Sequence, residues 1–363
     1  MVIAMIYLDY SATTKADKKV IDKFVETEEN YFANPNSNHY LGKECNKEIK
    51  DAINTICNSL GIKENEIIFT SGASESNNTV LKGLNVNHII TTKLEHSSIT
   101  TPVGYLQTKG IKVDFVSLDE NGLVDIDNLL SLIDDEPTLV SIGMVNSETG
   151  IKQDIDKIGS ILKDYSNVYF HSDITQALGK IPVDLTNIDL ASFSMHKIFG
   201  FRGIGGLVKK ENIKITPLVH GGKSTSIYRS GTPQTGLIVS SSVAIEEAVQ
   251  NVEEHYSKVL ELNSYLKEQI KDIVTINSNE YSIPHVLNFS IKGKNSEDTL
   301  QYFSDKGILI SSKTACSSGS YSFVVNELYH DMDRAESSNR VSISYKTTKE
   351  ELDEFIKLLK EWV

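Results

Sequence analysis

The chain has 363 residues, of which 39% are hydrophobic and 23% are charged, as is typical of a globular protein of about two domains. Its formal net charge of -13 argues against direct binding of nucleic acid over a general surface. No apolar run approaches the roughly 20 residues of a membrane-spanning helix, and the apolar start of the chain is too short for a secretion signal. We therefore expect no membrane partner.

The cysteines are few, namely Cys45, Cys57 and Cys316. No Cys-x-x-Cys pair and no His/Cys cluster with zinc spacing occurs, so no metal site is expected. So few thiols favour a reducing, cytoplasmic location. Cys45 and Cys57 fall in a long predicted helix, and we expect both to be buried and inert.

The first two thirds of the sequence alternate predicted strands and helices. Predicted helices cover 16–27, 41–60, 126–133 and 155–163, and another begins near 75. Predicted strands cover 66–70, 88–92, 112–116, 139–145, 168–173, 189–194 and 205–208. This alternation predicts an α/β fold with a mainly parallel, doubly wound sheet.

The last third has a different pattern. A helical pattern without a lasting heptad repeat covers 236–274 and predicts a long connector between two domains. Beyond it, strands at 286–291, 308–310 and 340–344 and helices at 296–306 and from 349 predict a smaller α+β domain, with which segment 7–11 is expected to pair. In the last helix, four apolar residues recur at helical spacing and are predicted to be core: Leu352, Phe355, Leu359 and Val363.

Two predicted strands end in residues that could carry chemistry. One is followed by His196 and Lys197, and the other ends at Asp173. A lysine in a crowded turn can form a Schiff base with a carbonyl compound if its pKa is lowered. An acid for the ring nitrogen and a lysine for the aldehyde are what pyridoxal phosphate requires. By itself a Ser-x-His-Lys sequence more often marks a solvated lysine, so other features of the sequence are needed to distinguish this from a cofactor-binding lysine.

Small residues at 71–74 lead from a strand into a helix. Free backbone N–H groups and the helix dipole make such a terminus favourable for a phosphate, although an ordinary helix cap is the alternative. His96 and Asn146 also follow predicted strands. Ligands bind outside the carboxyl ends of strands in open α/β sheets, so both are candidate ligand contacts.

Residues 311–321 contain five serines, one glycine and Cys316, without apolar periodicity. Such a composition predicts a mobile loop. An exposed thiol invites oxidation, which favours the interpretation that this one is used.

Together these motifs resemble the class V aminotransferase family of pyridoxal-phosphate enzymes, and within it the NifS/IscS-like cysteine desulfurases. The resemblance is carried, in the family's order, by Ser-Gly-Ala-Ser-Glu-Ser-Asn-Asn at 71–78, Glu95-His96, Asp173-x-x-Gln176, Ser194-x-His196-Lys197 and Thr-Ala-Cys-Ser-Ser at 314–318. It implies fold type I, with a seven-stranded-type sheet in a large cofactor-binding domain over 13–257. A small domain of 1–12 and 258–363 would carry the cysteine loop.

The resemblance also implies a role for each matching residue. Lys197, Cys316 and His96 would be the catalytic residues: Lys197 would hold the cofactor and move protons, His96 would stack on its ring, and Cys316 would be the nucleophile. The other cofactor contacts would be Ala73, Ser74, Asp173, Gln176, Ser194, His196 and, from a partner subunit, Thr232. The substrate carboxylate would be held by Asn146 and Arg340.

The implied function is conversion of L-cysteine to L-alanine by a homodimer, with sulfur passed through a Cys316 persulfide to an acceptor protein for iron–sulfur cluster assembly or for tRNA or cofactor thiolation. Alternatives are a selenocysteine lyase, another class V lyase or aminotransferase, and an inactive sulfur-handling scaffold. One departure from the family pattern is Ile174 in place of alanine, which predicts crowding on the cofactor side.

Overall fold

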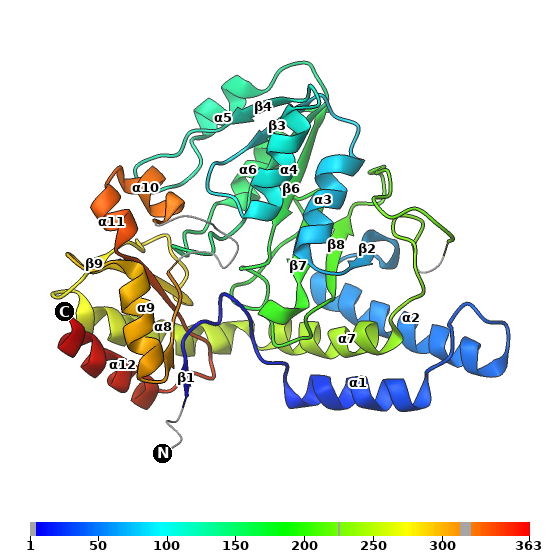
Figure 1. The fold of residues 1–363 in the computed structure, drawn as a ribbon. Helices are drawn as coiled ribbons and strands as arrows, with labels where there is room; N and C mark the ends of the chain where they lie inside the picture. Colours follow the sequence, from blue (N-terminus) through cyan, green and yellow to red (C-terminus); the bar gives the residue numbers. More distant parts are fainter. Residues whose placement is uncertain (1–4, 224–225, 313–320) are drawn as a thin grey trace.

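The computed structural model describes residues 5–223, 226–312 and 321–363 (Figure 1). Its largest layer is a seven-stranded sheet. The strands are β2 (Ile67–Thr70), β3 (His88–Thr91), β4 (Lys112–Phe115), β5 (Thr138–Ser141), β6 (Val168–Asp173), β7 (Leu190–Ser194) and β8 (Gly205–Lys209). They lie in the order β2-β8-β7-β6-β5-β3-β4, and β8 is antiparallel to both of its neighbours while the other pairs are parallel. The predicted mainly parallel sheet is confirmed.

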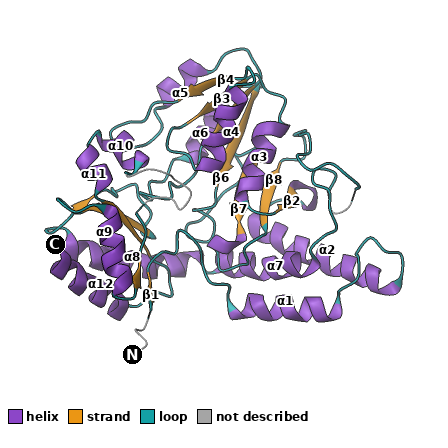
Figure 2. Cartoon of the chain, in the orientation of Figure 1, coloured by secondary structure: helices purple, strands orange, loops and turns teal. Residues whose placement is uncertain are grey.

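Helices cover this sheet (Figures 1 and 2). They are α1 (Lys18–Asn30), α2 (Tyr40–Leu60), α3 (Ala73–Gly83), α4 (Ser97–Gln107), α5 (Ile126–Leu132), α6 (Ile155–Leu162) and α7 (Thr235–Gln250). In α2 the buried residues Cys45, Ile49, Ala52 and Ile56 recur every three or four positions, which gives the helix one apolar face. α7 packs against α1 and α2, and α3 packs against α4.

The C-terminal part forms a separate lobe around α8 and α12 (Figure 1). Its elements are α8 (Val252–Ile270), β9 (Thr275–Ile276), β10 (Val286–Ser290), α9 (Ser296–Asp305), β11 (Ile308–Leu309), α10 (Phe323–Tyr329), α11 (Met332–Glu336), β12 (Ser338–Ser342) and α12 (Lys349–Trp362). β12, β10 and β9 form an antiparallel sheet. The N-terminal strand β1 (Ile6–Tyr7) pairs in parallel with β11, so the expected pairing of the chain's start with this part is confirmed.

Several sequence expectations need correction. The helical stretch at 236–274 is two helices, α7 and α8, separated at Asn251. Val363 is 53% exposed because α12 ends at Trp362, whereas Leu352, Phe355 and Leu359 are buried as predicted. The sequence reasoning missed α4, whose polar first turn and internal Pro102 hide its helical pattern. Cys45 and Cys57 are buried free thiols, as expected.

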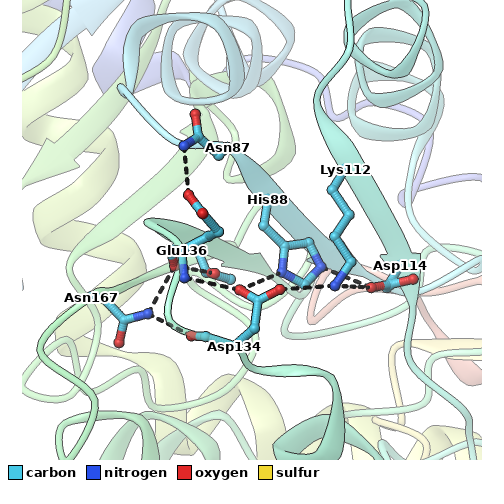
Figure 3. Close-up of polar contacts among 8 residues, drawn as sticks. Asn87, His88, Lys112, Asp114, Asp134, Glu136 and Asn167 are labelled. Atoms are coloured by element: carbon cyan, nitrogen blue, oxygen red, sulfur yellow. Dashed lines mark hydrogen bonds and ion pairs between the residues drawn. The ribbon is translucent and has the colours of Figure 1, made fainter.

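Polar side chains gather at the amino ends of the strands (Figure 3). His88 begins β3, and its Nε2 lies 2.9 Å from Asp114 of β4. Lys112, at the start of β4, pairs with Asp114 and with Asp134. We call this set the amino-end cluster; it comprises Asn87, His88, Lys112, Asp114, Asp134, Glu136 and Asn167.

None of the helices in the described part of the chain has the length and apolar character needed to cross a bilayer. Over the same residues, no group of three or more His, Cys, Asp or Glu side chains is placed to hold a metal ion.

Candidate active site at the carboxyl end of the sheet

A cavity of about 250 Å³ lies where β3, β5, β6 and β7 end. In this sheet the chain turns to opposite sides after β3 and after β5, and the carboxyl ends at such a point are where open α/β sheets bind ligands. The cavity brings together the predicted site residues Ala73, Ser74, His96, Asn146, Asp173, Gln176, Ser194, His196, Lys197 and Arg340. Thr232 is exposed and is not on this wall, and Cys316 lies outside the described residues.

Lys197 enters the cavity from the short 3-10 helix Met195–Lys197 that directly follows β7. Its Nζ donates hydrogen bonds to the carbonyl oxygens of Ser11 and Ala12, the latter at 2.8 Å. The N-terminal segment thus forms the wall opposite the lysine. Two backbone acceptors hold the amine at one place, where it can reach a carbonyl compound in the cavity.

The first turn of α3 forms one end of the cavity. Ala73 N–H donates to Ser194 Oγ at 2.7 Å, which ties the helix start to the end of β7. A Cβ on Gly205 would lie 2.6 Å from the Cα of Gly72, so this close approach of backbones requires glycine. Free N–H groups at the start of the helix and the Ser74 hydroxyl make this end suitable for a phosphate.

His196 lies beside the start of α3 on the same wall. Its Nδ1 is 3.1 Å from Thr13 Oγ1. Burial, followed by the nearby charges of Lys197, Arg202 and Lys180, lowers the pKa of His196 to about 4. The ring is therefore neutral near pH 7 and can act as a hydrogen-bond partner for a phosphate without adding charge.

Asp173 stands at the end of β6. Its Oδ2 accepts a hydrogen bond from Asn77 Nδ2 at 2.7 Å, and its Oδ1 accepts one from Thr175 N–H at 3.0 Å. The two donors fix the carboxylate in the cavity wall. A carboxylate held in this way can pair with a protonated pyridine nitrogen.

His96 is the N-cap of α4, and this role orients its ring. Its Nδ1 accepts from Ser98 N–H at 3.1 Å and lies 2.8 Å from Ser98 Oγ. Burial lowers the pKa of His96, and the Lys197 charge lowers it further while Asp173 opposes the shift. A largely uncharged ring on the cavity wall is suited to stacking on an aromatic ring.

Glu95 is a site residue whose importance the sequence reasoning missed. Its carboxyl accepts hydrogen bonds from Thr92 Oγ1 at 2.8 Å and from Gly143 N–H at 3.0–3.1 Å. Desolvation on the cavity wall, with the negative charge of Asp173 adding to it, raises the pKa of Glu95 to about 7. Its position immediately before His96, at the end of a buried strand, was the signal that could have identified it.

Arg340, in β12, is 1% exposed and reaches the cavity from the C-terminal lobe. It donates to Asp9 Oδ1 at 2.8 Å and to the Ser147 carbonyl at 2.9 Å. Its Nε is buried and has no hydrogen-bond partner among the described residues. A buried donor without a partner is costly, so this guanidinium is suited to bind an anionic group that enters the cavity.

The Asn146 amide is partly used by its own loop. Its Oδ1 accepts from the N–H groups of Glu148 and Thr149, and its Nδ2 donates to the Leu94 carbonyl at 3.0 Å. One amide hydrogen remains for a ligand, since an NH₂ group carries two.

Ile174 does not crowd the cavity as expected. Its side chain is buried in the apolar core among residues such as Ala177 and Leu178, because it points to the face of the sheet opposite that of Asp173.

The described residues that flank the Cys316 segment are hydrogen-bonded to Arg340, which lines the cavity, and to Glu148, which follows the lining residue Ser147. On its N-terminal side, Ser311 N–H donates to the Arg340 carbonyl at 3.1 Å. On its C-terminal side, Ser322 Oγ donates to Glu148 Oε2 at 2.6 Å. Both attachments are close to groups that line or flank the cavity.

Comparison with known proteins agrees with this geometry. The model of the aminotransferase class-V family matches residues 6–355. The chain is 34% identical to cysteine desulfurase IscS of Dictyoglomus turgidum, over 96% of this chain and 92% of that protein. Among solved structures, a NifS-like protein matches with a TM-score of 0.93 and 32% identity over 99% of both chains. A structure described as SspA in complex with cysteine matches with a TM-score of 0.82 and 29% identity, over 94% of this chain and 100% of that chain.

The fold, the cavity at the carboxyl end of the sheet and these similarities lead to one conclusion: the chain belongs to the class V aminotransferase family and, within it, to the pyridoxal-phosphate-dependent cysteine desulfurases of the NifS/IscS-like group.

Proposed function

We propose that the cavity converts L-cysteine to L-alanine and that Cys316 takes the sulfur atom as a persulfide. The observation that carries this proposal is that Lys197, Asp173 and Arg340 line one cavity, with the Nε of Arg340 buried and unpartnered among the described residues. These three groups are what an amino-acid substrate and pyridoxal phosphate need: an amine, an acid for the ring nitrogen and a site for the carboxylate.

The residues present fit the cofactor. In our proposal the start of α3, with Ala73 and Ser74, and the side chains of Ser194 and His196 hold the phosphate. Asp173 pairs with the ring nitrogen, Gln176 donates to the phenolate oxygen and His96 stacks on the ring. The bound cofactor supplies the electron sink that lets bonds at the substrate's Cα and Cβ be broken.

The chain's own residues perform the other tasks. Arg340 binds the cysteine carboxylate, together with the remaining amide hydrogen of Asn146. Lys197, once its amine is released, takes the proton from Cα and moves protons between substrate atoms. The Cys316 thiolate attacks the substrate sulfur, so the Cβ–S bond breaks as an S–S bond forms. Cβ then takes a proton, and alanine leaves.

The contacts of the described residues that flank the cysteine segment support the role of Cys316. Ser311 and Ser322 fasten its two ends beside Arg340 and Glu148. Cys316 is four residues beyond Ser312, and a chain of four residues spans at most about 14 Å. The remaining thiols, Cys45 and Cys57, are buried, and burial raises the pKa of Cys57 to about 11, so neither is suited to attack a substrate.

Sulfur bound on a protein thiol must pass to an acceptor protein, and we propose cluster assembly or thiolation of tRNA or cofactors as its destination. We further propose a cytoplasmic homodimer in which the exposed Thr232 contacts the phosphate in the partner's cavity. The division into a large domain of 13–257 and a small domain of 1–12 and 258–363 is part of the same proposal. It is supported by a separate apolar cluster that joins Leu8 to residues from Val259 onward.

Single-turnover release of alanine from L-cysteine tests the proposal, with the variant Cys316→Ala beside the wild type. We expect alanine from the wild type and none from the variant, while the matched control Cys45→Ala behaves as the wild type. Equal alanine from Cys316→Ala would exclude Cys316 as the nucleophile and would favour a lyase that releases its product directly.

A further inference from the structure

Lys180 is a buried lysine next to the cavity to which the proposed chemistry gives no role. It is 6% exposed and follows Gln176 by four residues, in the turn-rich segment after β6. Its Nζ donates a hydrogen bond to the side-chain carbonyl Oε1 of Gln176. A buried lysine is costly unless its amine is used, so this contact invites a functional explanation.

The contact is one link of a longer chain of hydrogen bonds. Gln176 donates from Nε2 to the carbonyl oxygen of Ser11 at 3.0 Å. The same carbonyl oxygen accepts a hydrogen bond from Lys197 Nζ. One amide side chain and one backbone carbonyl therefore connect Lys180 with the lysine that holds the cofactor.

This arrangement fixes which end of the Gln176 amide faces the cavity. Its oxygen is directed to Lys180, so its NH₂ group must face Ser11 and the cavity. One of the two amide hydrogens is used by Ser11, and the other remains for a ligand. Without Lys180, rotation of the amide by half a turn would present an oxygen to an anionic ligand atom, and two acceptors would then face each other.

The surroundings of Lys180 are basic. Burial lowers the pKa of its amine well below the usual range, and the charges of Lys197 and Arg340 lower it further. His196 and His285 also lie within electrostatic reach. Charged or neutral, the amine still carries N–H groups, so it donates to Gln176 in either state.

We propose that Lys180 is a positioning residue that holds the Gln176 amide with its NH₂ group toward the phenolate oxygen of pyridoxal phosphate. This inference rests on the proposed function of the cavity. It predicts that Lys180 acts on the bound cofactor through Gln176 and not through the stability of the fold.

A spectroscopic pH titration of the holoenzyme tests the proposal in the variant Lys180→Met. With the cofactor bound to Lys197, a titratable proton would be shared between the linking nitrogen and the phenolate oxygen. Loss of a donor makes that oxygen more basic, so the midpoint of the absorbance change is expected at higher pH, by about one unit, which corresponds to roughly 1.4 kcal/mol. An unchanged midpoint in a folded variant would overturn the proposal.

The chain offers a matched control in Lys209. It is 1% exposed, lies at the far end of the sheet in β8, and donates to the carbonyl oxygens of Lys210 and Ile213. Lys209→Met also removes a buried amine, so it should affect the unfolding temperature without moving the cofactor's midpoint. An equal movement of the midpoint in this variant would show a general effect of destabilisation and contradict the proposal.

A double-mutant cycle separates action through Gln176 from direct action. Lys180→Met should move the midpoint in the wild-type background and leave it unchanged when Gln176→Leu is already present. Additive movements would contradict the proposal. Lys180→Leu is measured in parallel, so that one apolar variant remains if the other does not fold. If the proposed function itself were wrong, the variant Lys197→Ala would have the same cofactor spectrum as the wild type. That result is distinct from every outcome of the Lys180 variants.

Discussion

The two ends of the seven-stranded sheet carry similar side chains with different surroundings. In the amino-end cluster, His88 contacts Asp114, Lys112 contacts Asp114 and Asp134, and Asn87 donates to Glu136 at 2.7 Å (Figure 3). At the carboxyl end, Lys197 and Arg340 line the cavity, and Lys180 lies behind Gln176, to which it donates a hydrogen bond. Opposite charges pair with one another at the first end. At the second end Arg340 pairs with Asp9, but Lys197, Asp173 and the Arg340 side chain also line the cavity.

The comparison shows where function can be identified in this molecule. The amino-end cluster pairs its charged side chains with one another, and the one buried atom there without a hydrogen-bond partner among the described residues, His88 Nδ1, lies 3.6 Å from Asp134 Oδ1. The carboxyl end keeps an unpartnered Arg340 Nε, a Glu95 whose pKa is raised to about 7 and a His196 whose pKa is lowered to about 4. Shifted pKa values and unused donors together mark the end that binds and reacts.

The largest effect should come from Lys197→Ala. This change removes the amine that we propose holds the cofactor and moves protons, so turnover should fall by at least about 10²–10⁴-fold, the range for loss of a general acid–base group. Alanine release from L-cysteine, measured at equal cofactor occupancy, checks it. Retained full activity would refute the assignment of Lys197.

Glu95→Gln should alter how stability depends on pH. The pKa of Glu95 rises from an ordinary value near 4.5 to about 7 through burial, so the folded state binds its proton more tightly than the unfolded state does. The wild type should therefore lose stability as pH rises from about 4.5 to 7, by on the order of 3 kcal/mol.

The variant lacks this titration. The free energy of unfolding of cofactor-free protein can be measured with denaturant at pH 5 and pH 8. Relative to the wild type, Glu95→Gln should be more stable at pH 8 than it is at pH 5. Parallel stability curves for the two proteins would contradict the assignment.

Arg340→Ala should weaken cysteine binding. Loss of a charge-assisted hydrogen bond costs about 1.5–3 kcal/mol, or roughly a 10- to 100-fold rise in KM. A control is Arg334→Ala, because Arg334 donates to Asn277 and Ile276 in the C-terminal lobe and is not on the cavity wall. An unchanged dependence of rate on cysteine concentration in Arg340→Ala would exclude it from substrate binding.

The smallest effect on catalysis is expected at the amino-end cluster. His88→Leu removes a buried partner of Asp114 and should lower the free energy of unfolding by about 1–3 kcal/mol. The kcat/KM of the folded fraction should equal that of the wild type. A large loss of kcat/KM would show that the two ends are coupled and would contradict the claim that only the carboxyl end takes part in catalysis.

The sequence predicted much of the fold because the buried strands are short apolar runs that end in polar residues. Strand ends in the sequence indicated Asp173, Lys197, His96 and Asn146 as candidates, and all four line the cavity. Gln176, Ser194 and Arg340 were predicted only through the family resemblance. What it missed depends on tertiary contacts. Glu95 is held by hydrogen bonds from Thr92 and Gly143, and the proposed role of Lys180 depends on its contact with Gln176; the sequence alone indicates neither.

One expectation failed for a geometric reason. Ile174 follows Asp173 directly, and successive side chains of an extended segment point to opposite faces, so it enters the core. The prediction that Val363 belongs to the core failed for another reason, because the apolar repeat of α12 continues one step beyond the end of the helix.

The central claim is that the carboxyl-end cavity transfers sulfur from cysteine to Cys316. The most direct measurement uses L-cysteine with isotopically labelled sulfur, followed by mass spectrometry of peptides from the non-reduced enzyme. The account predicts one labelled sulfur atom on the peptide that contains Cys316, none on those with Cys45 or Cys57, and an equal amount of alanine. Alanine with all the label free in solution, or on another cysteine, would contradict it.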